Sequence, residues 1–126
     1  MASAEELLER LFTEGMNGGN DTVVDEVLAE DYTNHSFGAN GRDAMKGVIG
    51  GFRSAFPDIQ ITIDERIVVG DRAAQRGHFT GTHEGEFAGM PGTGKHVTVQ
   101  FMDWWVMRDG LLADNWVVMD FSQLAG

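Results

Sequence analysis

The stretch Lys95–Phe121, KHVTVQFMDWWVMRDGLLADNWVVMDF, decides the fold that we expect for this chain. Two long segments rich in apolar residues flank Asp109-Gly110. An Asp-Gly pair between such segments is a strong signal for a two-residue hairpin turn, because both positions of that turn need positive φ. In this register Arg108 faces Leu111, and the whole stretch is predicted to form one β-hairpin.

Counting outward from the turn predicts which side chains share a face of this hairpin. Trp105 faces Asp114, Asp103 faces Trp116, Phe101 faces Val118 and Val99 faces Asp120. Side chains alternate along a strand, so these residues lie on one face, which we expect to line a dry, apolar cavity. Asp103 and Asp120 lie deep on this wall. A carboxylate in such a place is paired with another group, lies at the rim of the cavity, or has a shifted pKa.

The opposite face of the hairpin is also too apolar to remain in water. It holds Gln100, Met102, Trp104, Val106, Leu112, Asn115, Val117, Met119 and Phe121. Two covered faces imply two different covers, of which one is the protein's own helices. We therefore expect a homodimer through Met102, Trp104, Val106, Val117 and Met119.

Three amphipathic helices are predicted before residue 58. The first begins at the capping residue Ser3 and ends before Gly15, and the second runs from Asn20 or Asp21 to about Asp31. The third starts after residues 40–41 and carries an apolar stripe, Met45, Val48, Ile49, Phe52 and Phe56, that Pro57 ends. Residues 32–36 follow the second helix as a short extended segment.

A second hairpin is predicted from residue 58 to residue 82, with Gly70-Asp71 as its turn. This register pairs Glu65 with Arg76, Ile63 with His78 and Ile61 with Thr80. Arg76 and His78 would then stand on the isoleucine face. Two interpretations stay open: an ion pair of Arg76 with Glu65 and a hydrogen-bonded His78, or polar groups that line a cavity.

Composition limits the possible functions. The chain has 126 residues, a net charge of -11 and no cysteine, which suits one domain over residues 1–126 and argues against nucleic acid and anionic membranes as partners. It has no apolar run that could span a bilayer and no signal-peptide pattern, so we expect a cytoplasmic protein. Its histidines and carboxylates lack metal-binding spacing, so no metal is expected.

Several motifs occur in an order typical of one family. They are FRSAFPD at 52–58, GTHEGEF at 81–87, PGTGK at 91–95, RDG at 108–110 and WVVMD at 116–120. With three helices, a hairpin, a glycine-rich loop and a second hairpin, the chain resembles the SnoaL-like polyketide cyclases, or ester cyclases, of the nuclear-transport-factor-like superfamily. The resemblance implies an α+β cone, a curved antiparallel or mixed sheet whose concave face is covered by about three N-terminal helices.

The resemblance also implies a function and a set of site residues. Family members close a ring in aromatic polyketides by intramolecular aldol condensation, without cofactor or metal. The family's acid/base aspartate corresponds to Asp120, with His35 or His78 to orient the substrate or stabilise an enolate. The expected binding residues are His83, Phe52, Ile63, Arg76, Phe101, Asp103, Trp116 and Val118. One departure concerns the pocket, because Gly77 stands where an aromatic residue is usual.

We therefore expect an enzyme that transfers a proton at carbon in a hydrophobic carbonyl compound. Burial should raise the pKa of Asp120. The alternative for Asp120 is a structural aspartate bonded to backbone amides. The alternatives for the protein are a non-catalytic binder of a hydrophobic small molecule and a ketosteroid-isomerase-like or epoxide-opening enzyme of the same fold. A buried Tyr32, the sole tyrosine, would favour the isomerase.

Overall fold

The computed structural model describes residues 2–124. It begins with helix α1, Ala4–Arg10, which continues directly into a π-helical segment, η1, Leu11–Asn17. The predicted cap is present, because Ser3 Oγ accepts a hydrogen bond of 3.2 Å from the backbone N–H of Glu6. The apolar stripe of these two segments is buried, as shown by Leu7, Leu8, Leu11 and Met16.

The second predicted helix is shorter than expected. Helix α2 spans Val23–Val27, and strand β1, Leu28–Asn34, follows it at once. Strand β2, Ala39–Asn40, pairs with β1, and helix α3 spans Arg42–Ala55. The prediction of helix to about residue 31 was wrong, because residues 28–34 pair with a strand almost eighty residues away. Such pairing overrides local propensity.

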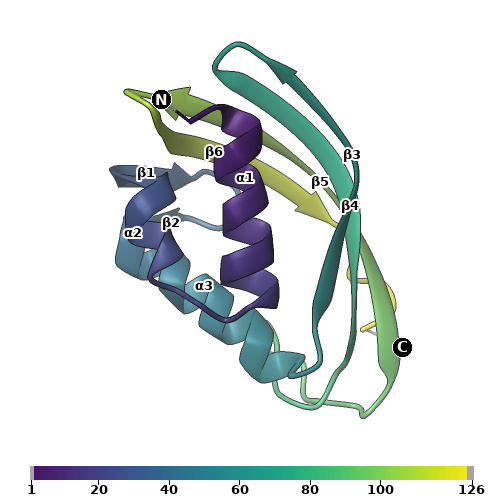
Figure 1. Cartoon of the computed structure of the whole chain (residues 1–126). Coiled ribbons are helices and arrows are strands. Elements are labelled where there is room, and N and C mark those ends of the chain that lie inside the picture. Colours follow the sequence, from purple (N-terminus) through teal and green to yellow (C-terminus); the bar gives the residue numbers. More distant parts are fainter. Residues whose placement is uncertain (1, 125–126) are drawn as a thin grey trace.

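The remaining strands form the two predicted hairpins, β3, Gln60–Val69, with β4, Arg72–Thr82, and β5, His96–Arg108, with β6, Leu111–Met119. Together the strands make a six-stranded mixed sheet in the order β2-β1-β6-β5-β4-β3, in which only β1 and β6 run parallel. The sheet is curved, and the helices lie against its concave side (Figure 1). The predicted α+β cone is confirmed.

The hairpin of β5 and β6 starts as predicted but then shifts by one residue. Arg108 pairs with Leu111, and both turn residues have positive φ, 54° at Asp109 and 80° at Gly110. A bulge at Ala113 then places two neighbouring residues of β6, Leu112 and Ala113, in the interior. Beyond it the observed pairs are Val106 with Asp114, Trp104 with Trp116, Met102 with Val118 and Phe101 with Met119.

This bulge exchanges the two faces of β6 relative to the prediction. An extra residue in one strand reverses the side of every residue that follows it. Trp116, Val118 and Asp120 are therefore exposed on the convex side, whereas Asn115 is buried on the concave side. The predicted placement of Trp116, Val118 and Asp120 on the cavity wall was wrong.

A second bulge, between Ile63 and Glu65, has the same effect in β3. The predicted pair of Glu65 with Arg76 is confirmed, but Ile63 pairs with Gly77 instead of His78. The side chains of Arg76 and His78 consequently stand on the convex face. There Arg76 Nε lies 3.0 Å from Glu65 Oε1, and His78 Nδ1 lies 2.8 Å from Asp64 Oδ2. The first of the two open interpretations, ion pair and hydrogen bond, is the one that the structure supports.

Two sets of polar contacts hold η1 in place, one to the sheet and one to helix α3. The side-chain amide of Asn17, at the end of η1, bonds the backbone of Ile61 in both directions, at 3.0 and 2.7 Å. From α3, Arg53 Nη1 donates to the carbonyl oxygens of Met16 and Asn17 at 2.8 and 2.9 Å. These contacts fix η1 over the concave face. No helix among residues 2–124 is long and apolar enough to cross a membrane.

Candidate functional site

A small cavity of about 60 Å³ lies between the concave face of the sheet and helices η1 and α3. Its walls are apolar except for three polar side chains, Asp103 of β5, Asn34 of β1 and Asn115 of β6. Asp103 is the only ionisable residue among the described residues that line it. The full lining is Phe12, Met16, Asn34, Phe37, Met45, Val48, Phe52, Ile61, Phe79, Phe101, Asp103, Trp105, Asn115, Val117 and Met119.

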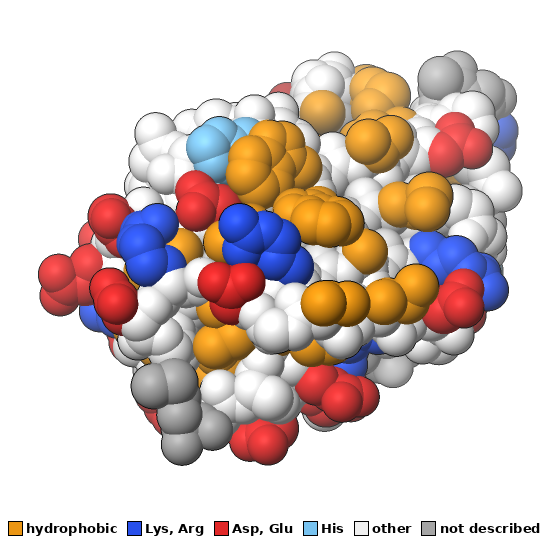
Figure 2. Space-filling model, turned by 90° about the horizontal axis from the view of Figure 1, so that it is seen from above, with side chains coloured by type: hydrophobic (Ala, Val, Ile, Leu, Met, Phe, Trp, Pro, Cys, Tyr) orange, Lys and Arg blue, Asp and Glu red, His pale blue; other side chains and the backbone are white. Residues whose placement is uncertain are grey.

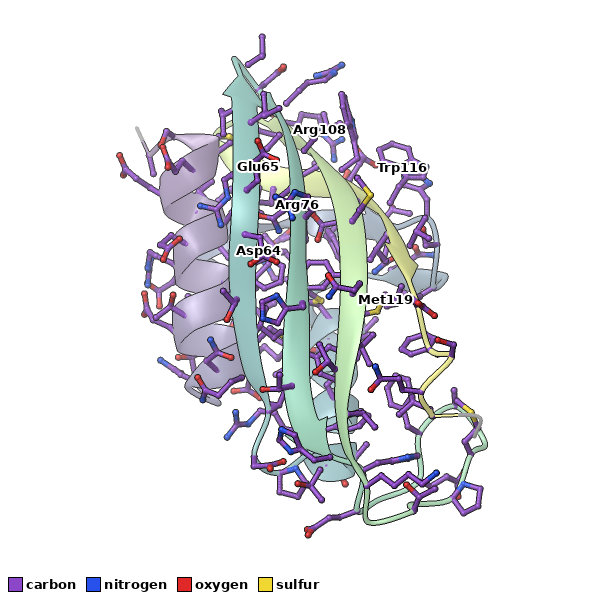
Figure 3. The ribbon with its side chains drawn as sticks, turned by 90° about the vertical axis from the view of Figure 1, so that its right-hand side faces the viewer. Asp64, Glu65, Arg76, Arg108, Trp116 and Met119 are labelled. Carbon is purple, nitrogen blue, oxygen red and sulfur yellow. The ribbon has the colours of Figure 1, made fainter. Side chains whose placement is uncertain are left out.

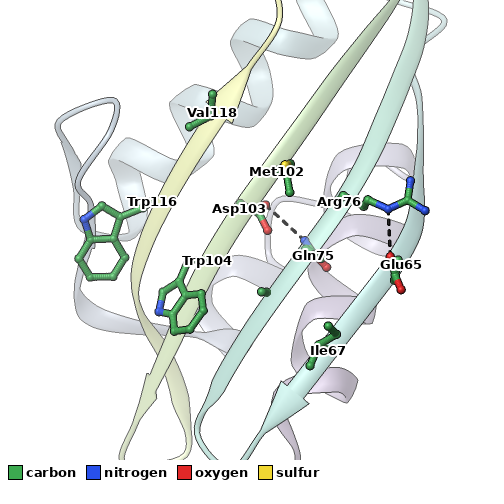
Figure 4. Close-up of a pocket in the computed structure, with 10 residues that line it drawn as sticks. Glu65, Ile67, Gln75, Arg76, Met102, Asp103, Trp104, Trp116 and Val118 are labelled. Carbon is green, nitrogen blue, oxygen red and sulfur yellow. Dashed lines mark hydrogen bonds and ion pairs between the residues drawn. The ribbon is translucent and has the colours of Figure 1, made fainter.

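The carboxylate of Asp103 is buried and only half satisfied. The residue is 8% exposed. Its Oδ2 accepts a hydrogen bond of 3.3 Å from Nε2 of Gln75, on the neighbouring strand β4 (Figure 4). Its Oδ1 is buried without a hydrogen-bond partner among residues 2–124. Burial disfavours the charged form and raises the pKa of Asp103 to about 7, although the bond from Gln75, the nearby indole N–H of Trp105 and the positive charge of Arg66 oppose the rise.

Tyr32 and Asn115 form a second polar contact on the inner side of the sheet. The Tyr32 hydroxyl donates to Asn115 Oδ1 at 3.2 Å, and Asn115 Nδ2 donates to the carbonyl oxygen of Trp104 at 3.2 Å. Burial raises the pKa of Tyr32 far above its ordinary value, so the phenol stays neutral. Its ring stacks on Trp105, with centroids 6.0 Å apart. Tyr32 thus orients Asn115, which lines the cavity.

A wider depression of about 380 Å³ adjoins the cavity and opens to the surface. Three residues, Phe37, Val48 and Phe52, line both spaces. The other residues of this mouth come from helix α3, the glycine-rich loop and the segment after β6. They are Gly51, Glu86, Phe87, Ala88 and Phe121. The shared residues show that the cavity and the mouth are neighbouring spaces.

The structure brings three of the predicted site residues together at the cavity, Phe52, Phe101 and Asp103. Ile63 is half-buried on the same side of the sheet but is not among the lining residues. His83 is buried, packs against Phe56 in a tilted arrangement with ring centroids 5.3 Å apart, and has no hydrogen-bond partner for either ring nitrogen among the described residues. It lies outside the cavity lining.

The three predicted catalytic residues lie elsewhere. Asp120 is exposed, and the backbone N–H of Ser122 donates to its Oδ1 at 3.0 Å. This bond lowers the pKa of Asp120, so the expected rise was wrong. His35 is exposed, stacks on Trp116 with centroids 4.3 Å apart and lies 2.9 Å from an oxygen of Asp114. His78 is on the convex face with Asp64.

Three polar residues of the site, Asn34, Gln75 and Asn115, were not predicted from the sequence. Gln75 lies one position before Arg76 on β4, and the bulge in the paired strand β3 puts Gln75, instead of Arg76, on the side of the sheet that Ile61 and Ile63 occupy. Asn115 precedes Trp116, and the bulge in β6 exchanged theirs. The only signal for the bulge in β6 is the run Leu111-Leu112-Ala113, in which apolar residues do not alternate with polar ones.

The remaining predicted residues line a shallow hollow of about 350 Å³ on the convex face. Figure 3 shows this face with Glu65, Arg76, Arg108 and Trp116, and Figure 4 shows the hollow in detail. Its apolar side chains are strongly exposed, with Val118 at 76%, Met102 at 64% and Trp104 at 45%. Seen from above, hydrophobic side chains gather at the centre and right of the surface, with charged groups at their edges (Figure 2).

Comparisons with known proteins agree with this architecture. TsrD from Streptomyces laurentii is 29% identical, with a TM-score of 0.85 over 92% of this chain and 87% of that chain. A SnoaL-like polyketide cyclase from Agrobacterium tumefaciens strain C58 is 14% identical, with a TM-score of 0.86 over 100% of both chains, a likeness of fold alone. No curated protein matches the chain.

A family model adds evidence from the sequence itself. The model described as SnoaL-like polyketide cyclase matches residues 6–125. This range includes every helix and strand that lines the cavity. The chain belongs to the SnoaL-like polyketide cyclase family.

Proposed function

We propose that this protein catalyses ring closure in a hydrophobic carbonyl compound of the aromatic polyketide type, with Asp103 as the acid/base group. The observation that carries the proposal is a single ionisable residue, with a pKa of about 7 and one unpartnered oxygen, in an otherwise apolar cavity. General acid/base groups are most effective when they titrate near the working pH. Asp103 meets this condition, whereas the exposed Asp120 has a lowered pKa.

The proposed step is the addition stage of an intramolecular aldol reaction, in which the only groups transferred are protons. Ionised Asp103 removes a proton from a carbon next to a carbonyl group. The resulting carbanion attacks a second carbonyl carbon of the same molecule, and a carbon–carbon bond forms. The oxygen of that carbonyl then takes a proton from the carboxylic acid of Asp103, which restores the carboxylate. The product is an isomer of the substrate, so the step balances without a further reactant.

The sizes of the two spaces support a particular orientation of the substrate. The inner cavity, about 60 Å³, accommodates a small side chain, whereas the mouth, about 380 Å³, accommodates fused rings. Phe37, Phe87 and Phe121 offer aromatic faces there, and aromatic pairs favour stacked or edge contacts. The reacting side chain would therefore reach Asp103 while the ring system stays in the mouth.

The pH dependence of ring closure tests this proposal. The assay follows an aromatic polyketide with a free β-keto ester side chain from pH 5 to 9. We expect kcat/KM to rise with the ionisation of Asp103 and to be half-maximal near pH 7. A rate that is already maximal at pH 5, as the lowered pKa of Asp120 would give, would contradict the assignment. Tight binding without turnover would favour the non-catalytic binder.

We also propose that a second copy of the chain covers the convex face. The predicted interface residues Met102 and Trp104 are exposed there, but Val117 and Met119 line the cavity, and Trp116 and Val118 take their place. Ile67 adds a further exposed apolar side chain. A patch of this kind on a monomer is unusual, and a two-fold dimer would bury it in both copies.

A charge at the centre of this patch tests the dimer. Trp104→Glu should weaken self-association by about 30-fold or more, since buried tryptophans often dominate interface energies. Thr13→Glu is the matched control, because it adds the same charge to an exposed position of η1 on the opposite layer. Sedimentation velocity at micromolar concentration provides the measurement. A wild-type protein that sediments only as a monomer would refute the interface.

A further inference from the structure

Four side chains from four elements form a continuous chain of polar contacts that ends at Asp103. Glu9 of α1 contacts Arg66 of β3, with Oε2 to Nη1 at 3.2 Å. Arg66 Nε donates to Gln75 Oε1 at 2.9 Å, and Gln75 Nε2 donates to Asp103 Oδ2 at 3.3 Å. Arg66 faces Gln75 and Gln75 faces Asp103 directly across neighbouring strands, so the sheet itself sets this spacing.

The chemistry of these groups determines the direction of every hydrogen bond in the chain. A guanidinium group has donors only, so Gln75 must present its carbonyl oxygen to Arg66. The amide nitrogen of Gln75 then points to Asp103, and because that nitrogen only donates, Asp103 Oδ2 must accept. A reversed Gln75 would bring its donors against those of Arg66. Arg66 therefore acts through Gln75 to make Oδ2 of Asp103 a hydrogen-bond acceptor.

We propose that Arg66 and Gln75 are positioning residues that keep Oδ2 of Asp103 an acceptor, so that the exchangeable proton resides on Oδ1. This inference rests on the proposed function only in that Asp103 is the acid/base group. Oδ1 is the buried oxygen with no partner among the described residues. It is therefore the atom that remains available to remove and return a proton.

Burial makes this arrangement persistent. Gln75 is 4% exposed and the Arg66 side chain is 9% exposed, so water has little access to the bonds between them. Hydrogen bonds to charged groups are stronger where solvent is excluded. Glu9, whose side chain is 65% exposed, holds the outer end of the guanidinium group. The chain of contacts thus links a surface carboxylate to a buried one.

Few other charged or titratable groups act on Asp103 from the surrounding elements. Tyr32 of β1 is near enough to interact electrostatically with Asp103, and burial keeps its phenol neutral. Strand β6 contributes the uncharged Asn115, and η1 contributes Phe12 and Met16. Arg66 is the cation that lowers the pKa of Asp103. Loss of Arg66 should therefore have a direct effect on the protonation of this carboxyl group.

Titration of the Asp103 carboxyl carbon by NMR tests the inference without any substrate. Arg66→Met keeps the length of the side chain but removes its donors and charge. We expect the midpoint for Asp103 to rise by about half a pH unit or more. Arg76→Met is the matched control, because it removes the same charge from the convex face of the adjacent strand, where Arg76 pairs with Glu65. The Asp103→Asn spectrum assigns the signal.

A second measurement uses the wild-type protein and does not depend on how a variant folds. The side-chain N–H of Gln75 that bonds Asp103 should move downfield as the carboxyl group ionises, with the same midpoint. Gln75→Met, which lacks this signal, assigns it. Equal titration midpoints for Arg66→Met and Arg76→Met would overturn the positioning role of Arg66 and Gln75. A Gln75 amide signal that does not shift as Asp103 ionises would overturn it as well. If both NMR results are as expected but the protein closes no ring, the proposed function is wrong and the positioning role stands.

Discussion

Asp103→Asn should lower the rate of ring closure by about 10²- to 10⁴-fold, the usual effect of removing a general acid or base. The amide has nearly the shape of the carboxyl group and can still accept the bond from Gln75, but it cannot take a proton from carbon. The rate is measured above pH 7, where wild-type Asp103 is largely ionised. A variant with unchanged turnover would remove Asp103 from the mechanism.

The same substitution should stabilise the protein at neutral and higher pH. The pKa of Asp103 is about 7 in the folded protein and has an ordinary value of 3.8. The native carboxyl group therefore holds a proton that the unfolded chain releases between these two pH values. The unfolding free energy of the wild type falls as pH rises through this window, by about 4 kcal/mol at full ionisation. Asparagine does not titrate, so the variant escapes this loss.

Chemical denaturation of the wild type and Asp103→Asn at pH 4 and pH 8 measures this difference. The variant should gain relative to the wild type only at pH 8. Asp120→Asn is the matched control, because Asp120 has a lowered pKa and bonds the amide of Ser122. It should leave the rate unchanged and make the protein slightly less stable at pH 8. A loss of rate from Asp120→Asn alone would restore the family-based assignment.

Gly77→Ala should destabilise the fold by about 3 kcal/mol, at the upper end of the range for overpacked positions. A Cβ at Gly77 would collide with the backbone carbonyl oxygen of Thr62 and would lie 2.9 Å from the ring of Phe101. The carbonyl belongs to the paired strand β3 and cannot move far without loss of pairing. Phe101 would have to move, and it lines the cavity. The melting temperature should fall by about 10 °C.

Gly47→Ala is the same substitution at a position with free space, and it should stabilise the protein. Gly47 lies in α3, and a Cβ there meets no atom within 4 Å. Alanine is favoured over glycine in a helix, so the free energy of unfolding should rise by about 1 kcal/mol. Thermal unfolding of both variants separates steric conflict from a general effect of alanine. Equal melting temperatures would show that Phe101 does not depend on the space above Gly77.

The fold could be predicted from the sequence because its strongest local signals agree with the final structure. The Asp109-Gly110 turn, the stripe of α3 and the alternation in β5 each depend on neighbouring residues, and all three are present. The parallel pairing of β1 with β6 depends on a contact between residues distant in sequence. No local pattern indicates that contact, so residues 28–31 of β1 were expected in a helix, whereas residues 32–34 were correctly expected to be extended.

The site could be predicted only in part for a different reason. Residues on β5, such as Phe101 and Asp103, were placed correctly because that strand alternates without interruption. On β6 the hairpin turn was correct, but the bulge at Ala113 reversed the strand after three residues. An error of one position in a period of two reverses every later assignment. Asp120 and Trp116 were misplaced for this reason alone.

Because of the bulge at Ala113, the number of residues between the turn and Trp116 determines which side chains of β6 face the interior and which face the surface. Deletion of one residue there would turn Trp116, Val118 and Asp120 inward together, and Asn115, Val117 and Met119 outward. A single codon lost or gained in β6 would thus exchange the lining of the pocket with the outer face, an outcome that no point substitution in that strand can produce. Relatives that differ by one residue between the turn and the tryptophan therefore cannot be compared position by position across this strand.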